Sequence, residues 1–153
     1  MSMRMNNLFN SAFEMSLRVI SLMGIYDAPC TKDRIFCLDF ITCYASAFGY
    51  PMENLHGNNK YMYGELSNRR TLLQEAIKAL VTTGAISAGI VNKEYVFSIT
   101  AAGRQYVDSF ESDYAKQYVK IARVVAKSYR NVSDQELMDI IQDKALSSAK
   151  GGN

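Results

Sequence analysis

Residues 61–100 read YMYGELSNRRTLLQEAIKALVTTGAISAGIVNKEYVFSIT and decide the fold of this chain. Apolar side chains recur at helical spacing over residues 66–81, which predicts an amphipathic helix, and Gly84 ends it. Two runs rich in β-branched and aromatic residues follow at 86–91 and 95–99. This stretch therefore predicts one helix followed by two short strands.

The two predicted strands are close enough in sequence to form a tight hairpin. Asn92 and Lys93 suit a two-residue turn with positive φ, and Thr100 is a suitable N-cap for another helix. A helix, a tight hairpin and a further helix follow one another in the second half of a winged-helix domain. We therefore predict a mainly α-helical protein with a small β-hairpin. Its fold would be a winged-helix (winged helix-turn-helix-like) domain with additional C-terminal helices.

The N-terminal half of the chain predicts two helices and a loop. Ser11 and Glu14 have the spacing of a capping box, and Thr31 is a good N-cap for a second helix. Residues 35–48 are apolar almost all round, so we expect this helix to lie at the centre of the core. Residues 49–60 contain Gly, Pro and Asn at close intervals and predict a loop.

The C-terminal part predicts a long amphipathic helix over residues 113–130. A short helix then begins at the capping box formed by Ser133 and Glu136 and ends near Leu146. The predicted organisation has four parts: an N-terminal tail (1–8), a winged-helix-like domain (9–130), a C-terminal helix (131–146) and a disordered tail (147–153).

The composition is that of a globular protein. Of the 153 residues, 48% are hydrophobic and 21% are charged, and the net charge is only +2. Contact with DNA would therefore need a local basic patch. The sequence shows no signal peptide and no run of roughly 20 apolar residues that could cross a bilayer. We expect a soluble, cytoplasmic protein.

Catalytic and metal-binding motifs are absent from the sequence. It has no phosphate-binding glycine loop, no dinucleotide-binding glycine pattern and no zinc-protease motif. Cys30, Cys37 and Cys43 lack Cys-x-x-Cys spacing and, with the single histidine His56, do not predict a zinc site. We expect buried, reduced thiols and a solvated loop histidine. The expected protein is not an enzyme and uses no catalytic residue, cofactor or metal.

Two sets of charged residues are candidates for binding. In the first set, Glu65 and Arg69 are spaced i,i+4 on a predicted helix, and one interpretation is a local ion pair alone. The other is that Arg69 and Arg70 point in different directions, so that one closes an ion pair and the other contacts a partner. With Tyr61, these residues form the predicted partner-binding set.

The second set lies on the helix predicted over residues 113–130. One side of this helix is apolar, and the other carries cations within roughly 80° at about 100° per residue. We call these residues the basic stripe: Lys116, Lys120, Arg123, Lys127 and Arg130. Three interpretations are open for the stripe, namely a solvated face, contact with DNA phosphates, or contact with an acidic surface of a partner protein.

Three motifs resemble those of a known family. They are Phe-Asn-Ser-x-x-Glu at residues 9–14, Tyr-x-x-Gly-Glu-Leu-x-x-Arg-Arg at 61–70, and Thr-x-x-Gly at 100–103 followed by Glu-Ser-x-Tyr-Ala at 111–115. With these motifs the chain resembles the small middle component of bacterial ABC-three-component systems. That group includes the small subunit of Lamassu-type defence operons. The motif at 61–70 is the most specific of the three.

The resemblance implies a function that composition cannot show. Members of this family accompany a coiled-coil ATPase of the SMC/Rad50 type, and a separate effector subunit, often a nuclease, completes the complex. These complexes defend bacteria against phages and plasmids. The small subunit is expected to be a non-catalytic, kleisin-like or winged-helix factor that bridges ATPase heads, the effector and DNA. It would bind DNA only within the complex, and neither a membrane nor a small-molecule substrate.

The alternative function is that of a free-standing winged-helix DNA-binding transcriptional regulator. The helix predicted over residues 66–81 would then enter the major groove, with four candidate contacts: Asn68, Arg69, Gln74 and Lys78. The low net charge favours the subunit. So does the predicted hairpin, whose only charges are Lys93 and Glu94, because a wing that binds phosphates is normally more basic.

Overall fold

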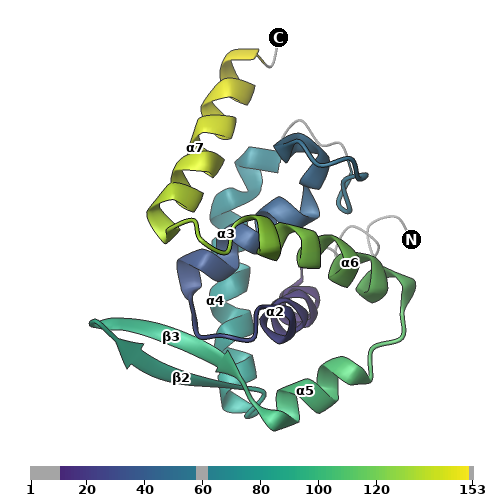
Figure 1. The fold of residues 1–153 in the computed structure, drawn as a ribbon, viewed down its shortest axis with the longest axis vertical. Helices are drawn as coiled ribbons and strands as arrows, with labels where there is room; N and C mark the ends of the chain where they lie inside the picture. Colours follow the sequence, from purple (N-terminus) through teal and green to yellow (C-terminus); the bar gives the residue numbers. More distant parts are fainter. Residues whose placement is uncertain (1–10, 58–61, 152–153) are drawn as a thin grey trace.

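A computed structural model describes residues 11–57 and 62–151 of the chain. The protein is mainly helical with a small antiparallel sheet (Figure 1), as predicted. Its α-helices are α2 (Ala12–Tyr26), α3 (Lys32–Cys43), α4 (Leu66–Thr82), α5 (Ala101–Asp108), α6 (Asp113–Ser128) and α7 (Asp134–Gly151). Shorter elements are the 3₁₀ helices η1 (Ala45–Phe48) and η2 (Met62–Glu65) and the strands β1 (Cys30–Thr31), β2 (Ile86–Val91) and β3 (Glu94–Ile99). Within the two described ranges, none of the helices has the length and apolarity needed to cross a membrane.

Helix α3 forms the centre of the core, which confirms the prediction from its apolar sequence. All residues from Arg34 to Ala45 are buried. Helices α2, α6 and α7 pack against α3, and α4 packs against α2 (Figure 1). One apolar cluster runs through all of these elements, so the core is continuous from α2 to α7.

Side-chain caps set the starts of the helices. The hydroxyl groups of Ser11, Thr31, Thr100 and Ser112 each accept a hydrogen bond from the backbone amide three residues further on. The first three of these caps confirm sequence predictions. The capping box at the start of α7 is also confirmed, because the Glu136 amide donates to Ser133 Oγ at 3.1 Å.

The sheet has three strands, one more than the sequence predicted. Its order is β1-β3-β2, and all pairs are antiparallel. Asn92 and Lys93 adopt positive φ values of 51° and 68°, which confirms the predicted two-residue turn between β2 and β3. Strand β1 was missed because Cys30 and Thr31, which pair with Phe97 and Val96, are too few to show a period of two.

Helix α7 is longer than predicted, and this corrects the predicted end near Leu146 and the disordered tail over 147–153. The helix continues to Gly151. Residues 147–150 contain no proline or glycine, so no helix-breaking residue occurs before Gly151. Residues 152–153, and the tail predicted over residues 1–8, lie outside the described residues.

Hydrogen bonds and an ion pair hold the N-terminus of α7 against the start of α3. Asp134 accepts hydrogen bonds from Thr31 Oγ1 at 2.5 Å and from Arg34 Nε at 2.7 Å. Arg34 also donates to the backbone carbonyls of Tyr129 and Val132. From this base α7 extends beyond the other helices (Figure 1). The first turn therefore fixes the position of a helix whose far end projects from the body.

Gly103→Ala should destabilise the protein, because Gly103 in α5 lies directly against the base of the hairpin. A Cβ atom there would overlap the Ala85 carbonyl oxygen and lie 2.9 Å from Ile99 Cγ1. We expect the free energy of unfolding in urea to fall by about 1–3 kcal/mol. The matched control is Gly24→Ala in α2, where the nearest atom is Ile99 Cδ1 at 3.6 Å and where alanine should be neutral or stabilising. Equal effects of the two substitutions would contradict this account of Gly103.

Candidate functional site

The structure separates the predicted partner-binding residues from one another. Tyr61 lies outside the described residues, and Glu65 is the last residue of η2. The side chain of Arg69 is 1% exposed, whereas that of Arg70 is 38% exposed. The two adjacent arginines therefore point in different directions, as one of the two interpretations of the sequence required.

Arg69, one of the four residues in the predicted partner-binding set, lies in the interior, so it is the arginine that closes the ion pair and not the one at the surface. Its Nε atom is 3.8 Å from Glu65 Oε2, so the predicted i,i+4 ion pair is present. The guanidinium also lies 5.0 Å from the centre of the Tyr44 ring and 5.7 Å from that of Phe40. While the core is intact, Arg69 can contact neither a partner protein nor a DNA base.

Asp39 brings buried polar side chains from four helices together. Its Oδ1 atom accepts hydrogen bonds from Arg18 Nε at 2.9 Å and from the Tyr118 hydroxyl at 2.8 Å. Its Oδ2 atom lies 3.8 Å from Arg69 Nη1. These side chains are all buried, and they come from α2, α3, α4 and α6. We call them the central charge cluster: Arg18, Asp39, Arg69 and Tyr118.

Two guanidinium groups share one carboxylate in the central charge cluster. Burial desolvates the Asp39 carboxylate and by itself would raise its pKa, but the charges of Arg18 and Arg69 outweigh this and hold the pKa below its ordinary value. The Nε and Nη1 atoms of Arg69 make no hydrogen bond. Attraction to the Asp39 and Glu65 carboxylates and contact with the Tyr44 and Phe40 rings therefore stabilise this part of the buried guanidinium.

His56 belongs to the same buried network, which shows that the prediction of a solvated histidine was wrong. Its Nδ1 atom is hydrogen-bonded to Arg69 Nη2, and its Nε2 atom lies 2.8 Å from the Tyr114 hydroxyl. Because an arginine can only donate, Nδ1 must accept, so the neutral ring carries its proton on Nε2. Burial, then Arg18 and Arg69, lower the pKa of His56 to about 2. His56 thus anchors the described part of the loop, up to residue 57, against the helical core.

The three thiols are not available as nucleophiles. Cys30, Cys37 and Cys43 are buried and free of disulfides, as predicted. Burial raises their pKa values to about 12, about 12 and about 11, respectively, so the reactive thiolate form is strongly disfavoured. In the part of the chain that the structure describes, no group of His, Cys, Asp or Glu side chains could hold a metal ion.

Arg70 lies at the surface where α3, α4 and α7 meet. Its guanidinium stacks 4.1 Å from the centre of the Phe36 ring and pairs with Asp33 at 3.4 Å. Its Nη2 atom lies 3.3 Å from the sulfur of Met138. Arg70 therefore has contacts within the chain and an exposed edge that a partner can reach. Its role in partner binding stays a prediction.

Four cations of the basic stripe lie on the exposed side of α6, and Arg130 lies just past the end of this helix at Ser128, two residues before the predicted end. Tyr118, Ile121 and Val125 are buried on the inner side, whereas all five cations of the stripe are exposed, as the sequence predicted. Among the residues that the structure describes, no acidic side chain forms an ion pair with the stripe. Arg130 alone has a ring contact, 5.6 Å from the centre of Tyr26. The charge of the stripe is therefore directed at solvent or at a partner.

Sequence reasoning missed the centre of the buried network. Asp39 is the one charged residue within residues 35–48, and Arg18 stands among apolar neighbours in α2. A lone charge in an apolar helix signals a buried partner of opposite sign, because an unpaired buried charge is strongly destabilising. This signal could have identified Arg18 and Asp39, but not Arg69 or Tyr118, which lie on amphipathic helices.

Asp39→Asn should strongly destabilise the protein, because it leaves Arg18 and Arg69 buried without their shared counter-charge. We expect a loss of about 3–5 kcal/mol in the free energy of unfolding, measured in urea at pH 7. The matched control is Asp33→Asn, which removes a 3.4 Å ion pair whose partners are 38% and 51% exposed. That control should lose less than about 1 kcal/mol. Similar losses for the two variants would show that Asp39 is not the main counter-charge.

His56→Gln should flatten the pH dependence of stability. Below about pH 6.5 the unfolded chain binds a proton at His56, but the folded chain, with a pKa of about 2, does not. Wild-type stability should therefore fall as the pH decreases, with about 2 kcal/mol due to His56 between about pH 6.5 and 4.5. Tyr114→Phe, which keeps the histidine, is the control and should retain most of this slope. An unchanged slope in His56→Gln would mean that His56 is protonated in the folded state. Urea denaturation across this pH range measures both variants.

Comparison with known proteins places the chain in a family. No curated protein and no solved structure matches it. The family model of the ABC-three component (ABC-3C) system Middle Component 2 matches residues 8–150, which is nearly the whole chain. This match includes the buried network, the hairpin and the basic stripe. It confirms the family-level resemblance found in the sequence. The chain belongs to the ABC-three component system Middle Component 2 family.

Proposed function

We propose that this protein is a non-catalytic subunit that joins an SMC/Rad50-like ATPase to an effector, often a nuclease, in a bacterial complex against phages and plasmids. Membership of the Middle Component 2 family over residues 8–150 carries this proposal, because a middle component of a multi-component system implies protein partners. Within such a complex the subunit bridges the ATPase heads in the manner of a kleisin or a winged-helix factor. The Lamassu-type operons are the systems that its sequence motifs most resemble.

The order of the elements supports a winged-helix domain as the centre of this subunit. Helices and strands follow one another as α2, β1, α3, α4, β2 and β3, and the sheet order is β1-β3-β2. The β2–β3 hairpin takes the place of the wing and projects from the helical body (Figure 1). Helices α5, α6 and α7 are additions that cover α2 and α3 and supply the basic stripe.

The buried chemistry supports a role in binding and not in catalysis. The Cys30, Cys37 and Cys43 thiols have pKa values raised by burial, and His56 has a pKa lowered far below neutrality. These side chains therefore provide no thiolate at pH 7. They also provide no histidine that gains and loses a proton near that pH. Asp39 is held between arginines in the core, where its role is structural.

The basic stripe is the surface that we assign to DNA or to an acidic partner within the complex. Four of its cations lie along one side of α6 and Arg130 follows the end of the helix, and among the described residues none of the five forms an ion pair with an acidic side chain. Cations one helical turn apart can follow a phosphate backbone or an acidic surface. The regulator alternative is less well supported, because Arg69, one of its four base contacts, is buried.

Reversing Lys120, Arg123 and Lys127 to glutamate should abolish defence without unfolding the protein. The buried side of α6 is unchanged by these substitutions, so circular dichroism and the thermal midpoint should match the wild type within a few degrees. Plaque assays in cells that carry the whole operon should show lost protection. DNA-stimulated ATPase activity of the purified complex should fall and should depend on salt concentration.

A control with the same change in net charge separates the stripe from a general charge effect. Lys32, Lys78 and Lys144 are exposed on α3, α4 and α7, and their reversal to glutamate should retain protection. Full protection by the stripe variant would show that the stripe is only a solvated face. Loss of protection in both variants would show that net charge, and not this surface, is responsible.

A further inference from the structure

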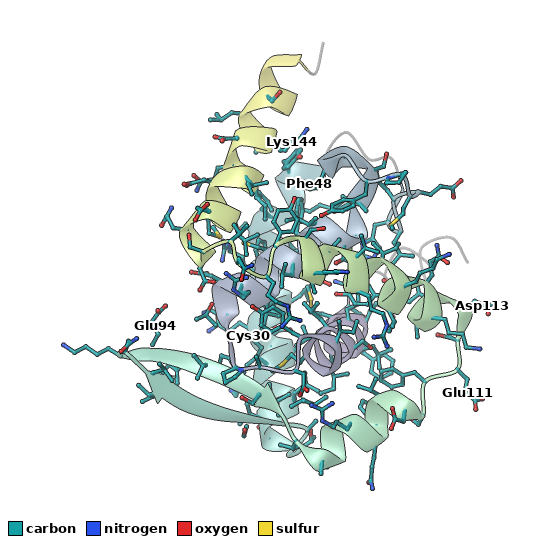
Figure 2. The ribbon with its side chains drawn as sticks, viewed as in Figure 1. Cys30, Phe48, Glu94, Glu111, Asp113 and Lys144 are labelled. Atoms are coloured by element: carbon teal, nitrogen blue, oxygen red, sulfur yellow. The ribbon has the colours of Figure 1, made fainter. Side chains whose placement is uncertain are left out.

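The β2–β3 hairpin carries an exposed apolar surface that the proposed function does not use. Five of the six residues of β2 are exposed, and only Ile86 at its base is buried. Near the turn, Ile90, Val91 and Tyr95 are 66%, 53% and 66% exposed. Figure 2 shows Glu94, next to the turn, far from the helical body. No other element of the described chain pairs with β2 on its outer side, because the sheet ends there.

Strand β2 lacks the features that normally protect a sheet edge. Its sequence, Ile86-Ser-Ala-Gly-Ile-Val91, contains no charged residue and no proline. The register to β3 is continuous from Ile86–Ile99 to Val91–Glu94, so no bulge interrupts it. Natural edge strands are usually blocked by lysines, prolines or bulges, because an open edge pairs readily with another strand. No strand of the described chain occupies this edge, and five of its six residues are exposed.

The pairing register shows which backbone groups of β2 face outward. In a hairpin with a two-residue turn, the flanking pair, here Val91 and Glu94, is hydrogen-bonded, and the pairs then alternate. The next pair beyond Ile86 and Ile99 agrees with this alternation, because the Thr100 amide donates to the Ala85 carbonyl at 3.1 Å. The amide and carbonyl groups of Ile86, Ala88 and Ile90 therefore point away from β3, toward the open edge.

We infer that this edge pairs antiparallel with β2 of a second copy of the chain, around a two-fold axis at Ala88. In this register Ala88 faces Ala88 of the second copy, and Ile86 faces Ile90. The backbone groups of all three outward-facing residues in each strand are then paired, and each facing pair of residues exchanges two hydrogen bonds. Registers shifted by two residues in either direction leave one of the three outside the paired strands.

The side chains of β2 are compatible with this self-pairing. Ile86, Ala88 and Ile90 alternate onto one face of the sheet, so Ile90 of each copy would lie opposite Ile86 of the other. Because Ile86 is already buried in its own chain, the apolar surface newly covered comes mainly from the exposed Ile90 and Ala88. Because β2 carries no charge, two copies bring no like charges together across the axis. An isologous contact of this kind closes as a dimer and does not propagate into a fibre. One strand pair is a small interface, so the dimer is weak and depends on concentration.

Charge substitutions at Ala88 test the axis directly. Ala88 is exposed, and its backbone groups are not needed for the β2–β3 pairing, so Ala88→Lys and Ala88→Glu should both remain folded by circular dichroism and thermal unfolding. Each variant alone places two like charges opposite one another and should weaken dimerisation at least about tenfold. An equimolar mixture of the two variants places opposite charges at the axis and should restore the dimer.

Sedimentation equilibrium of the full chain from about 1 to 500 µM gives the readout. The mean mass of the wild type should rise from 17.2 kDa toward twice that value. The matched controls are Gln105→Lys and Gln105→Glu, exposed on α5, which should dimerise like the wild type. Amide exchange should slow at Ala88 and Ile90 as the concentration rises, whereas Ser87 and Gly89, already paired with β3, should change little.

Three results would overturn this inference. The first is a wild-type chain that stays monomeric over the whole concentration range, and the second is dimerisation of the single Ala88 variants at wild-type strength. The third is a mixture of Ala88→Lys and Ala88→Glu that associates no better than either variant alone. A monomeric wild type whose Ala88 variants fail to join the ATPase complex would assign the edge to a strand of a partner protein.

Discussion

The Asp39 carboxylate balances two buried guanidinium groups, and the arrangement of four helices depends on that balance. Arg18, Arg69 and Tyr118 approach it from α2, α4 and α6, so the carboxylate fixes how these helices meet around α3. Apolar packing alone would tolerate small rotations of each helix, because it is not directional. Directional contacts to one central group restrict those rotations. Neutralising that group leaves Arg18 and Arg69 buried without their shared counter-charge.

The same network positions the surfaces that face outward. His56 lies between Arg69 and the Tyr114 hydroxyl, and Tyr114 and Tyr118 both lie on the inner side of α6. Because that side of α6 is held by polar contacts as well as by apolar packing, its other side presents the basic stripe in a fixed orientation. The interior of the protein and its most charged surface are therefore two sides of one helix.

Features that depend on local sequence were predictable, and features that depend on distant residues were not. The caps at Ser11, Thr31 and Thr100, the turn at Asn92 and Lys93 and the two sides of α6 follow from residues a few positions apart. Arg69 is buried and pairs with Asp39, whereas Arg70 is exposed and pairs with Asp33. Both carboxylates lie on another helix, so this difference could not be predicted from local sequence. The two-residue strand β1 and the burial of His56 likewise arise only once remote segments have met.

The contacts of α3 have a consequence for the order in which the chain can fold as it is synthesised. Tyr118 reaches Asp39 across 79 positions, and Asp134 reaches Arg34 across 100. Until those late segments leave the ribosome, the most apolar helix lacks part of its cover, and the hairpin forms beside an unfinished core. The incomplete chain thus leaves part of α3 uncovered until α6 and α7 have been synthesised.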